Sequence, residues 1–179
     1  MNAAILIIDV QQGLCEGPGA AHDCEGTILR INSVALKARK AKVPIIFIQH
    51  ESKQGYLEFG SAPWQLAHGL EVQASDLKIR KTTPDSFLDT KLELILRELK
   101  TERLVICGMH SEFCVDTTVR RALALGFPVT LVSDAHTSAG NAAITPQQVI
   151  AHHNATLTNI TSFGPRVIAA ASRDVKFTT

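Results

Sequence analysis

The sequence predicts a three-layer α/β/α fold, in which helices cover both faces of a Rossmann-like parallel sheet of six strands. Two observations predict it. Short apolar runs alternate along the chain with longer stretches whose apolar residues recur every three or four positions. The first run, 4–8, is apolar throughout, which is typical of a strand covered on both faces. Strands that alternate with helices form right-handed βαβ units, and hence one largely parallel sheet.

Length and composition limit the class of protein. The 179 residues suit a single domain, 1–179, with a core of its own. The chain is 45% hydrophobic and 20% charged, with a formal net charge of +1, so its charge balance does not favour nucleic acid as a partner. Its first residues lack the basic region and the length that predict a signal peptide, and no apolar run approaches the roughly 18 residues of a membrane span. We therefore expect a cytoplasmic protein with no membrane partner and with four reduced cysteines.

The first part of the chain predicts two strands and a helix. The run 4–8 is the central strand. The loop that follows, 11–24, holds three glycines and a proline, and its length is typical of loops that border an active site. Helical spacing over 26–42, with four basic residues near the end, predicts a helix. The isoleucine-rich run 44–49 predicts the second strand, and a glycine-containing excursion with a short helix after Pro63 comes next.

The middle of the chain repeats the alternation. Residues 77–80 alternate in polarity and predict a short third strand. Leucines and an isoleucine at helical spacing predict a helix over 87–100. The apolar run 104–107 reads as a buried strand that stops at Gly108, and the periodic stretch 115–125 predicts the helix that follows it.

The last third predicts two more strands and a helix. The fifth strand covers 128–133, with residues 134–136 beyond its end. A threonine, a proline and a glutamine within 145–148 form a capped helix start, and that helix runs toward Asn159. The sixth strand is expected at 167–170.

Three chemically active side chains follow predicted strands. Asp9, Lys81 and Cys114 should meet, because the carboxyl ends of parallel strands share one edge. A thiolate can attack a carbonyl carbon, a carboxylate can take the thiol proton and pass it to a leaving amine, and the lysine can hold the pair electrostatically. Backbone amides within 110–114 could stabilise the oxyanion. From spacing alone, a loop cap, a surface charge and a structural thiol are equally good interpretations of the three.

Four motifs carry a family resemblance over nearly the whole chain. They are Ile-Ile-Asp-Val-Gln at 7–11, Lys81 with Ser-Phe at 86–87, Gly-Met-His-Ser-Glu-Phe-Cys-Val-Asp-Thr-Thr at 108–118, and Val-Ser-Asp-Ala at 132–135. With these motifs the chain resembles the isochorismatase-like cysteine hydrolases, which include nicotinamidases and N-carbamoyl amide hydrolases.

The resemblance implies a sheet ordered 3-2-1-4-5-6 and a catalytic triad of Asp9, Lys81 and Cys114. It also implies a cis peptide bond between Met109 and His110, which would turn the amides of His110 and Cys114 toward one oxyanion. Many relatives are oligomers, so a homodimer or homotetramer is expected.

One departure from the family pattern concerns metal binding. Nicotinamidases hold a metal through an Asp-x-His pair after the second strand, where this chain has Gln-His-Glu-Ser at 49–52. One histidine and a glutamate are too few for a zinc site, so we expect no metal, no other cofactor, and a substrate other than nicotinamide. The retained Cys114 favours hydrolysis of a C–N bond in a small-molecule amide, carbamoyl compound or lactam.

Two other functions stay open. One is the isochorismatase reaction, which hydrolyses a vinyl ether, and the other is a non-catalytic or redox thiol protein that binds ligands on the same fold. The expected substrate pocket is lined by Gln11, His50, Phe59, Trp64 and Phe113, although ordinary core packing explains the three aromatic residues equally well. His136 has the same two interpretations as His50, a pocket residue or a structural hydrogen bonder. His152 and His153 are neighbours on the last helix and point about 100° apart, which favours packing or an interface over one shared site.

Overall fold

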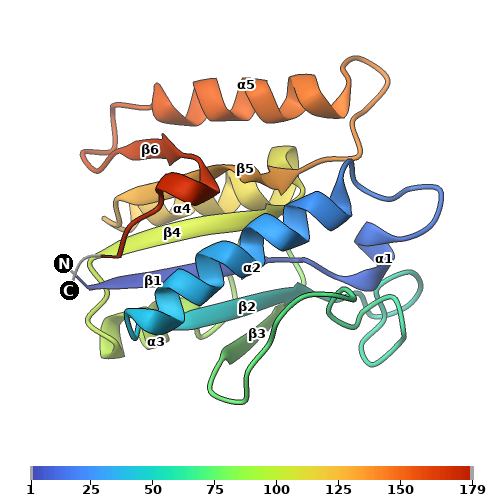
Figure 1. The fold of residues 1–179 in the computed structure, drawn as a ribbon, viewed down its shortest axis with the longest axis horizontal. Helices are drawn as coiled ribbons and strands as arrows, with labels where there is room; N and C mark the ends of the chain where they lie inside the picture. The colour runs from blue at the N-terminus through green and yellow to red at the C-terminus, as the bar shows by residue number, and fades with distance from the viewer. Residues whose placement is uncertain (1, 178–179) are drawn as a thin grey trace.

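A computed structural model describes residues 2–177 and contains one six-stranded parallel sheet (Figure 1). The strand order is β3-β2-β1-β4-β5-β6, which confirms the predicted fold class and topology. The strands are β1 (Ala3–Ile8), β2 (Ile45–His50), β3 (Leu77–Lys81), β4 (Arg103–Met109), β5 (Val129–Thr137) and β6 (Val167–Ala170).

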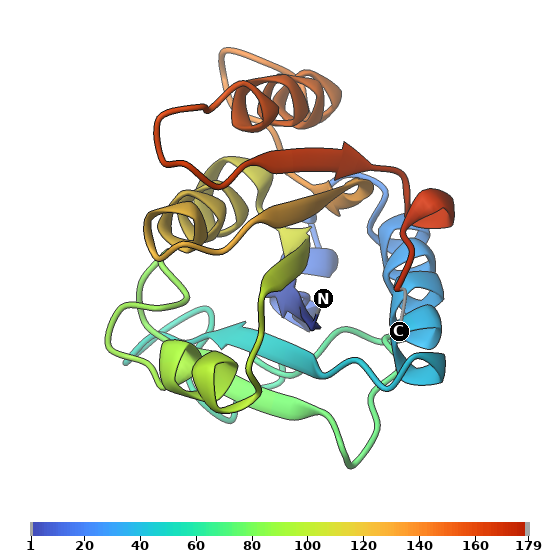
Figure 2. The ribbon, with the colours of Figure 1, turned by 90° about the vertical axis from the view of Figure 1, so that its left-hand side faces the viewer.

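Helices cover both faces of the sheet (Figure 2). One face carries α2 (Cys24–Lys40) and a short 3-10 helix, η2 (Ser172–Asp174). The other face carries α3 (Leu92–Glu98), α4 (Asp116–Ala124) and α5 (Pro146–Thr158). No helix in the described part, residues 2–177, is long and apolar enough to cross a membrane.

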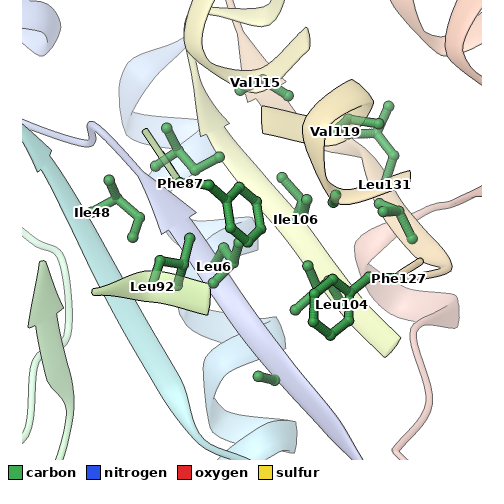
Figure 3. Close-up of a cluster of buried hydrophobic side chains, with 14 of the residues drawn as sticks. Leu6, Ile48, Phe87, Leu92, Leu104, Ile106, Val115, Val119, Phe127 and Leu131 are labelled. Carbon is green, nitrogen blue, oxygen red and sulfur yellow. The ribbon is translucent and has the colours of Figure 1, made fainter. Parts of the chain in front are cut away.

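Strand β1 supplies both halves of the core, because successive side chains of a strand point to opposite faces. Leu6 and Ile8 pack under α3 and α4, whereas Ile5 and Ile7 pack under α2. Figure 3 shows the first of these clusters, in which Leu6 and other sheet residues meet side chains such as Leu92 and Val119. The site at the end of β1 therefore rests on a strand that is buried on both faces.

Helix α3 is shorter than the predicted helix 87–100. The chain turns before it, because the Thr90 hydroxyl donates to the Ser86 carbonyl and accepts from the Leu92 amide. Asp89 also has a positive φ of 54°. Threonine side chains that bond the nearby backbone in this way compete with helix formation, so the helix begins only at Leu92.

Strand β5 is longer than the predicted 128–133 and includes residues 134–136, which we expected beyond its end. The pairing with β4 shifts register between Ile106 and Gly108 and then continues to Thr137. An irregularity of this kind lets a strand continue past polar residues that interrupt its apolar pattern.

The remaining differences are local. The loop 11–24 contains one helical turn, α1 (Gln12–Cys15), and the stretch after Pro63 forms turns in place of the expected short helix. A π-helical turn, η1 (Ser111–Val115), precedes α4. The expected capping box at Thr145 and Gln148 is present, and all four cysteines are free thiols, as predicted.

Candidate active site

Three strands bring the predicted catalytic side chains to one edge of the sheet. Asp9 directly follows β1, Lys81 is the last residue of β3, and Cys114 lies in η1 just after β4. Gly108, near the end of β4, makes the close approach of β4 to β1 possible. Its φ is 121°, and a Cβ atom there would overlap the backbone of Ile8.

The ammonium group of Lys81 joins the other two side chains. Its Nζ lies 2.6 Å from Oδ2 of Asp9 and 3.2 Å from Sγ of Cys114. It also donates to the Thr83 carbonyl at 3.0 Å and lies 3.3 Å from Nδ1 of His50. An ammonium has three hydrogens for these four acceptors. The predicted proximity of the three residues is thus confirmed, whereas their catalytic roles stay predictions.

Asp9 is held in an uncommon backbone conformation. Its φ is 51°, in the left-handed region, which aspartate tolerates better than most residues. Its amide donates to the Ile48 carbonyl, so the residue is fixed against β2 as well as β1. The side chain is 1% exposed, and Oδ1 is buried with no hydrogen-bond partner within the protein. This oxygen is therefore free to exchange a proton with a reacting group.

The Cys114 thiol is protonated at rest. Burial and, after it, the negative charge of Asp9 together raise its pKa to about 12, against the opposing effect of Lys81. A helix N-terminus, which in general favours the thiolate, does not outweigh these effects in the resting protein. A base must remove the proton before the sulfur can attack, and the carboxylate of Asp9 is in position to do so.

The turn around Cys114 begins with a cis peptide bond between Met109 and His110, as the family resemblance implied. The amides of Phe113 and Val115, on either side of Cys114, both donate to the His110 carbonyl at 3.1 and 3.2 Å. The turn is therefore closed by hydrogen bonds around the sulfur-bearing residue.

A metal ion is a second possible occupant of this place. Ligand atoms of Asp9, His50 and Cys114 all lie within 4.8 Å of one another, and carboxylate, imidazole and thiolate are all zinc ligands. The Lys81 ammonium, however, already contacts all three. Burial and this positive charge lower the pKa of His50, which keeps its imidazole neutral. The three side chains are therefore arranged around the Lys81 ammonium, and a metal ion beside it would be repelled by that positive charge.

A family model described as the isochorismatase domain matches residues 3–171. The chain belongs to the isochorismatase family. A streptothricin hydrolase of Streptomyces noursei is 33% identical over 134 residues, which are 74% of this chain and 49% of that protein. A ureidoacrylate amidohydrolase of Caulobacter vibrioides is 25% identical, and the match covers 78% of each chain. A crystal structure of an isochorismatase family protein, 34% identical, covers 95% of this chain and 98% of that one, with a TM-score of 0.87. This chain spans about half the length of the streptothricin hydrolases.

The expected pocket residues of this isochorismatase-family chain have different surroundings. Phe59 and Trp64 pack edge to face, with ring centroids 4.8 Å apart, and the guanidinium of Arg80 lies over the Phe59 ring. Both Phe59 and Phe113 are more than half exposed, so neither is a core residue. Core packing is therefore excluded for these two phenylalanines, and the prediction that they line a ligand site stays open.

Gln11 does not support a ligand-binding role. Its amide nitrogen donates to the carbonyls of His50 and Trp64, and its amide oxygen accepts from the His50 amide. Every donor of this buried side chain is used by the protein backbone. Gln11 instead joins the end of β2 to the segment that carries Trp64, and thereby holds two sides of the site together.

His136, for which a pocket role and a structural role both stayed open, lies behind the catalytic turn and makes structural hydrogen bonds. It is almost completely buried in β5, and Nδ1 lies 2.7 Å from the hydroxyl of Ser111. Its location could not be read from spacing, because we placed residues 134–136 outside the strand. His152 and His153 lie on α5, and Nδ1 of His153 contacts the Val149 carbonyl of the same helix.

Proposed function

We propose that this protein is a cysteine hydrolase that cleaves a C–N bond of a small molecule through a thioester intermediate. The observation that carries the proposal is the ammonium of Lys81, which lies within hydrogen-bond distance of both the Asp9 carboxylate and the Cys114 sulfur. A protein that only binds ligands has no need of a buried ammonium between a carboxylate and a thiol, because burying charges is costly.

The first half of the reaction forms the thioester. Asp9 takes the proton of the Cys114 thiol, and the sulfur attacks the carbonyl carbon of the substrate. The oxyanion that forms accepts hydrogen bonds from the backbone amides of His110 and Cys114, and the positive charge of Lys81 favours the negative charges that move through the site. Asp9 then passes its proton to the substrate nitrogen, the C–N bond breaks, and the amine leaves.

The second half releases the acid. Water loses a proton to Asp9 and attacks the thioester carbonyl. The C–S bond then breaks, and the proton returns to the sulfur of Cys114 as the carboxylic or carbamic acid leaves. Asp9 acts in turn as base, acid, base and acid, and Oδ1, which has no partner within the protein, is the oxygen suited to this exchange.

The names of two relatives support hydrolysis, and one of them specifies an amide, and hence a C–N bond, as the target. Streptothricin hydrolase and ureidoacrylate amidohydrolase are both named for hydrolysis. A small amide, a carbamoyl compound or a lactam is the substrate class that we propose. The exposed rings of Phe59 and Phe113 are available to bind its apolar part.

Intact-protein mass spectrometry tests the proposal directly. The protein is incubated with a panel of small amides, carbamoyl compounds and lactams, and a mass increase equal to the acyl group is expected. Cys114→Ala should abolish both the adduct and turnover, whereas the matched variant Cys15→Ala should retain both. Turnover by Cys114→Ala would contradict the proposal. So would hydrolysis of isochorismate, a vinyl ether, by a chain that leaves every amide intact.

A further inference from the structure

A buried chain of hydrogen bonds joins the catalytic turn to β5 and α5. The Ser111 hydroxyl lies 2.7 Å from Nδ1 of His136, and Nε2 of His136 lies 3.1 Å from Oδ1 of Asn154. The Asn154 amide nitrogen donates to the Ser133 carbonyl at 2.9 Å. Ser111 and His136 are both almost completely buried. A polar chain at such a depth is costly unless every member is satisfied, and these members satisfy one another.

The donors and acceptors of this hydrogen-bond chain can be assigned in one consistent direction. Because the Asn154 NH₂ group faces the Ser133 carbonyl, its Oδ1 faces the imidazole and must accept a hydrogen bond. His136 therefore carries its proton on Nε2, and Nδ1 accepts from the Ser111 hydroxyl. Burial lowers the pKa of His136, which keeps the ring neutral at pH 7.

This chain ends on the turn that bears the nucleophile. Ser111 is the first residue of η1, directly after His110 and three residues before Cys114. The next residue is also anchored, since Oε1 of Glu112 accepts from the Ser138 hydroxyl at 2.6 Å. Two consecutive side chains of the turn are thus tied to β5 and to the residue just beyond it.

We propose that His136 is a positioning residue. By accepting the hydrogen bond of Ser111, it fixes the turn that directs the His110 and Cys114 amides toward the oxyanion. The inference rests on the proposed function, because it assigns that oxyanion to the site. The hydrogen bonds of the His136 ring go to Ser111 and Asn154 and to no member of the triad, and the ring also lines a cavity of about 350 Å³ between α2 and α5.

Two thiol reagents distinguish a displacement of the amide donors from a loss of reactivity of the Cys114 sulfur. Iodoacetamide alkylates Cys114 without forming an oxyanion. Acetaldehyde adds to the thiol as a hemithioacetal: the S–C bond forms, the carbonyl π bond breaks, and the thiol proton ends on the oxygen. The hydroxyl oxygen of this adduct takes the place of the oxyanion and can accept hydrogen bonds from the same amides. The affinity for acetaldehyde, measured as protection of Cys114 against iodoacetamide, therefore depends on the amide donors as well as on the sulfur. Neither measurement requires turnover.

Two matched substitutions of His136 should differ in their affinity for acetaldehyde. In His136→Asn, the amide oxygen replaces Nδ1 and can still accept from Ser111, whereas in His136→Gln the amide replaces Nε2 and serves only Asn154. We expect acetaldehyde affinity to fall by about tenfold or more in His136→Gln and in Ser111→Ala, and to stay near that of the wild type in His136→Asn and Ser111→Thr. The alkylation rate should change much less in all four.

A further variant, His136→Ala, makes use of the cavity that His136 lines. Imidazole added to His136→Ala can enter beside Asn154 and should restore part of the acetaldehyde affinity. Equal losses in His136→Asn and His136→Gln would overturn the inference, and so would unchanged affinity in Ser111→Ala. A wild type that binds acetaldehyde through Cys114 but hydrolyses no amide would contradict the proposed function alone, because the aldehyde comparison still decides the role of His136.

Discussion

The Nζ atom of Lys81 lies 2.6 Å from Oδ2 of Asp9, and the two side chains are 0% and 1% exposed. Removing both charges from water costs several kcal/mol per ion, which their attraction repays only with good geometry. Lys81 gains a further acceptor in the Thr83 carbonyl, but Asp9 keeps one oxygen unpaired. The pair is therefore better suited to proton transfer than to stabilising the fold, since a purely structural ion pair would satisfy both carboxylate oxygens of Asp9.

Asp9→Asn should change thiol reactivity and turnover in opposite directions. Burial and then the charge of Asp9 raise the pKa of Cys114, whereas Lys81 lowers it. Removal of the carboxylate charge should therefore lower the thiol pKa and speed iodoacetamide labelling at pH 7. Turnover should fall by at least about 10²-fold, because no base or acid remains for the proton transfers. Mass spectrometry of the labelled protein measures the first effect and a substrate assay measures the second.

Cys15 is the internal control for that experiment, because its sulfur contacts Sδ of Met109 at 3.8 Å and has no hydrogen bond to Asp9 or Lys81. Its labelling rate should be the same in the wild type and in Asp9→Asn. Slower labelling of Cys114 in the variant, with Cys15 unaffected, would show that the carboxylate does not hold the thiol in its protonated form.

Lys81→Ala should convert the site into one that binds zinc. Without the ammonium, the ligand atoms of Asp9, His50 and Cys114 remain within 4.8 Å of one another around an empty centre. We expect Zn²⁺ to raise the melting temperature of this variant, and a second substitution, Cys114→Ser, to reduce that shift. Lys78→Ala is the matched control, since Lys78 is an exposed lysine of the same strand. An equal zinc shift in Lys78→Ala and Lys81→Ala would argue against this explanation.

The sheet and the meeting of three side chains were predictable for a simple reason. Buried parallel strands are apolar throughout, and polar residues at their carboxyl ends share one edge, which placed Asp9, Lys81 and Cys114 together. The hydrogen-bond partners of Gln11 and His136 were not predictable. Each of these side chains depends on partners distant in sequence, His50 for one and Ser111 for the other, and no local pattern marks such a pair. The family resemblance supplied the strand order and the cis bond, which spacing alone does not.

Gly108→Ala should destabilise the protein by about 2 to 4 kcal/mol. The substitution combines a φ of 121°, which side chains with a Cβ rarely adopt, with overlap against the Ile8 backbone, which cannot move without breaking β1 from its neighbours. Urea unfolding measures the change. Gly19→Ala, where a Cβ meets nothing within 4 Å, should change the free energy of unfolding by less than about 0.5 kcal/mol. Similar values for the two variants would contradict the steric argument.

The pH dependence of stability should contain a contribution from His136. Burial is the main cause that lowers its pKa in the folded state; the Asn154 hydrogen bond, Asp134 and Glu112 oppose it, and His153 adds to it. Below pH 6.5 the unfolded chain, in which histidine has an ordinary pKa of about 6.5, therefore binds a proton at this residue that the folded protein does not bind. Stability from this group is complete above pH 6.5 and is lost as the pH falls below that value.

The comparison of wild type with His136→Asn isolates that contribution, because the other histidines titrate in both proteins. Each unit of pH below 6.5 can remove at most about 1.4 kcal/mol, so between pH 7 and pH 5 the wild type should lose up to about 2 kcal/mol more than the variant. Urea unfolding at pH 7, 6 and 5 gives both curves. The absolute stability of His136→Asn does not enter, since only the slopes are compared. Parallel slopes would mean that His136 accepts a proton inside the folded protein as readily as outside it, and that the Ser111 hydrogen bond does not require the neutral ring.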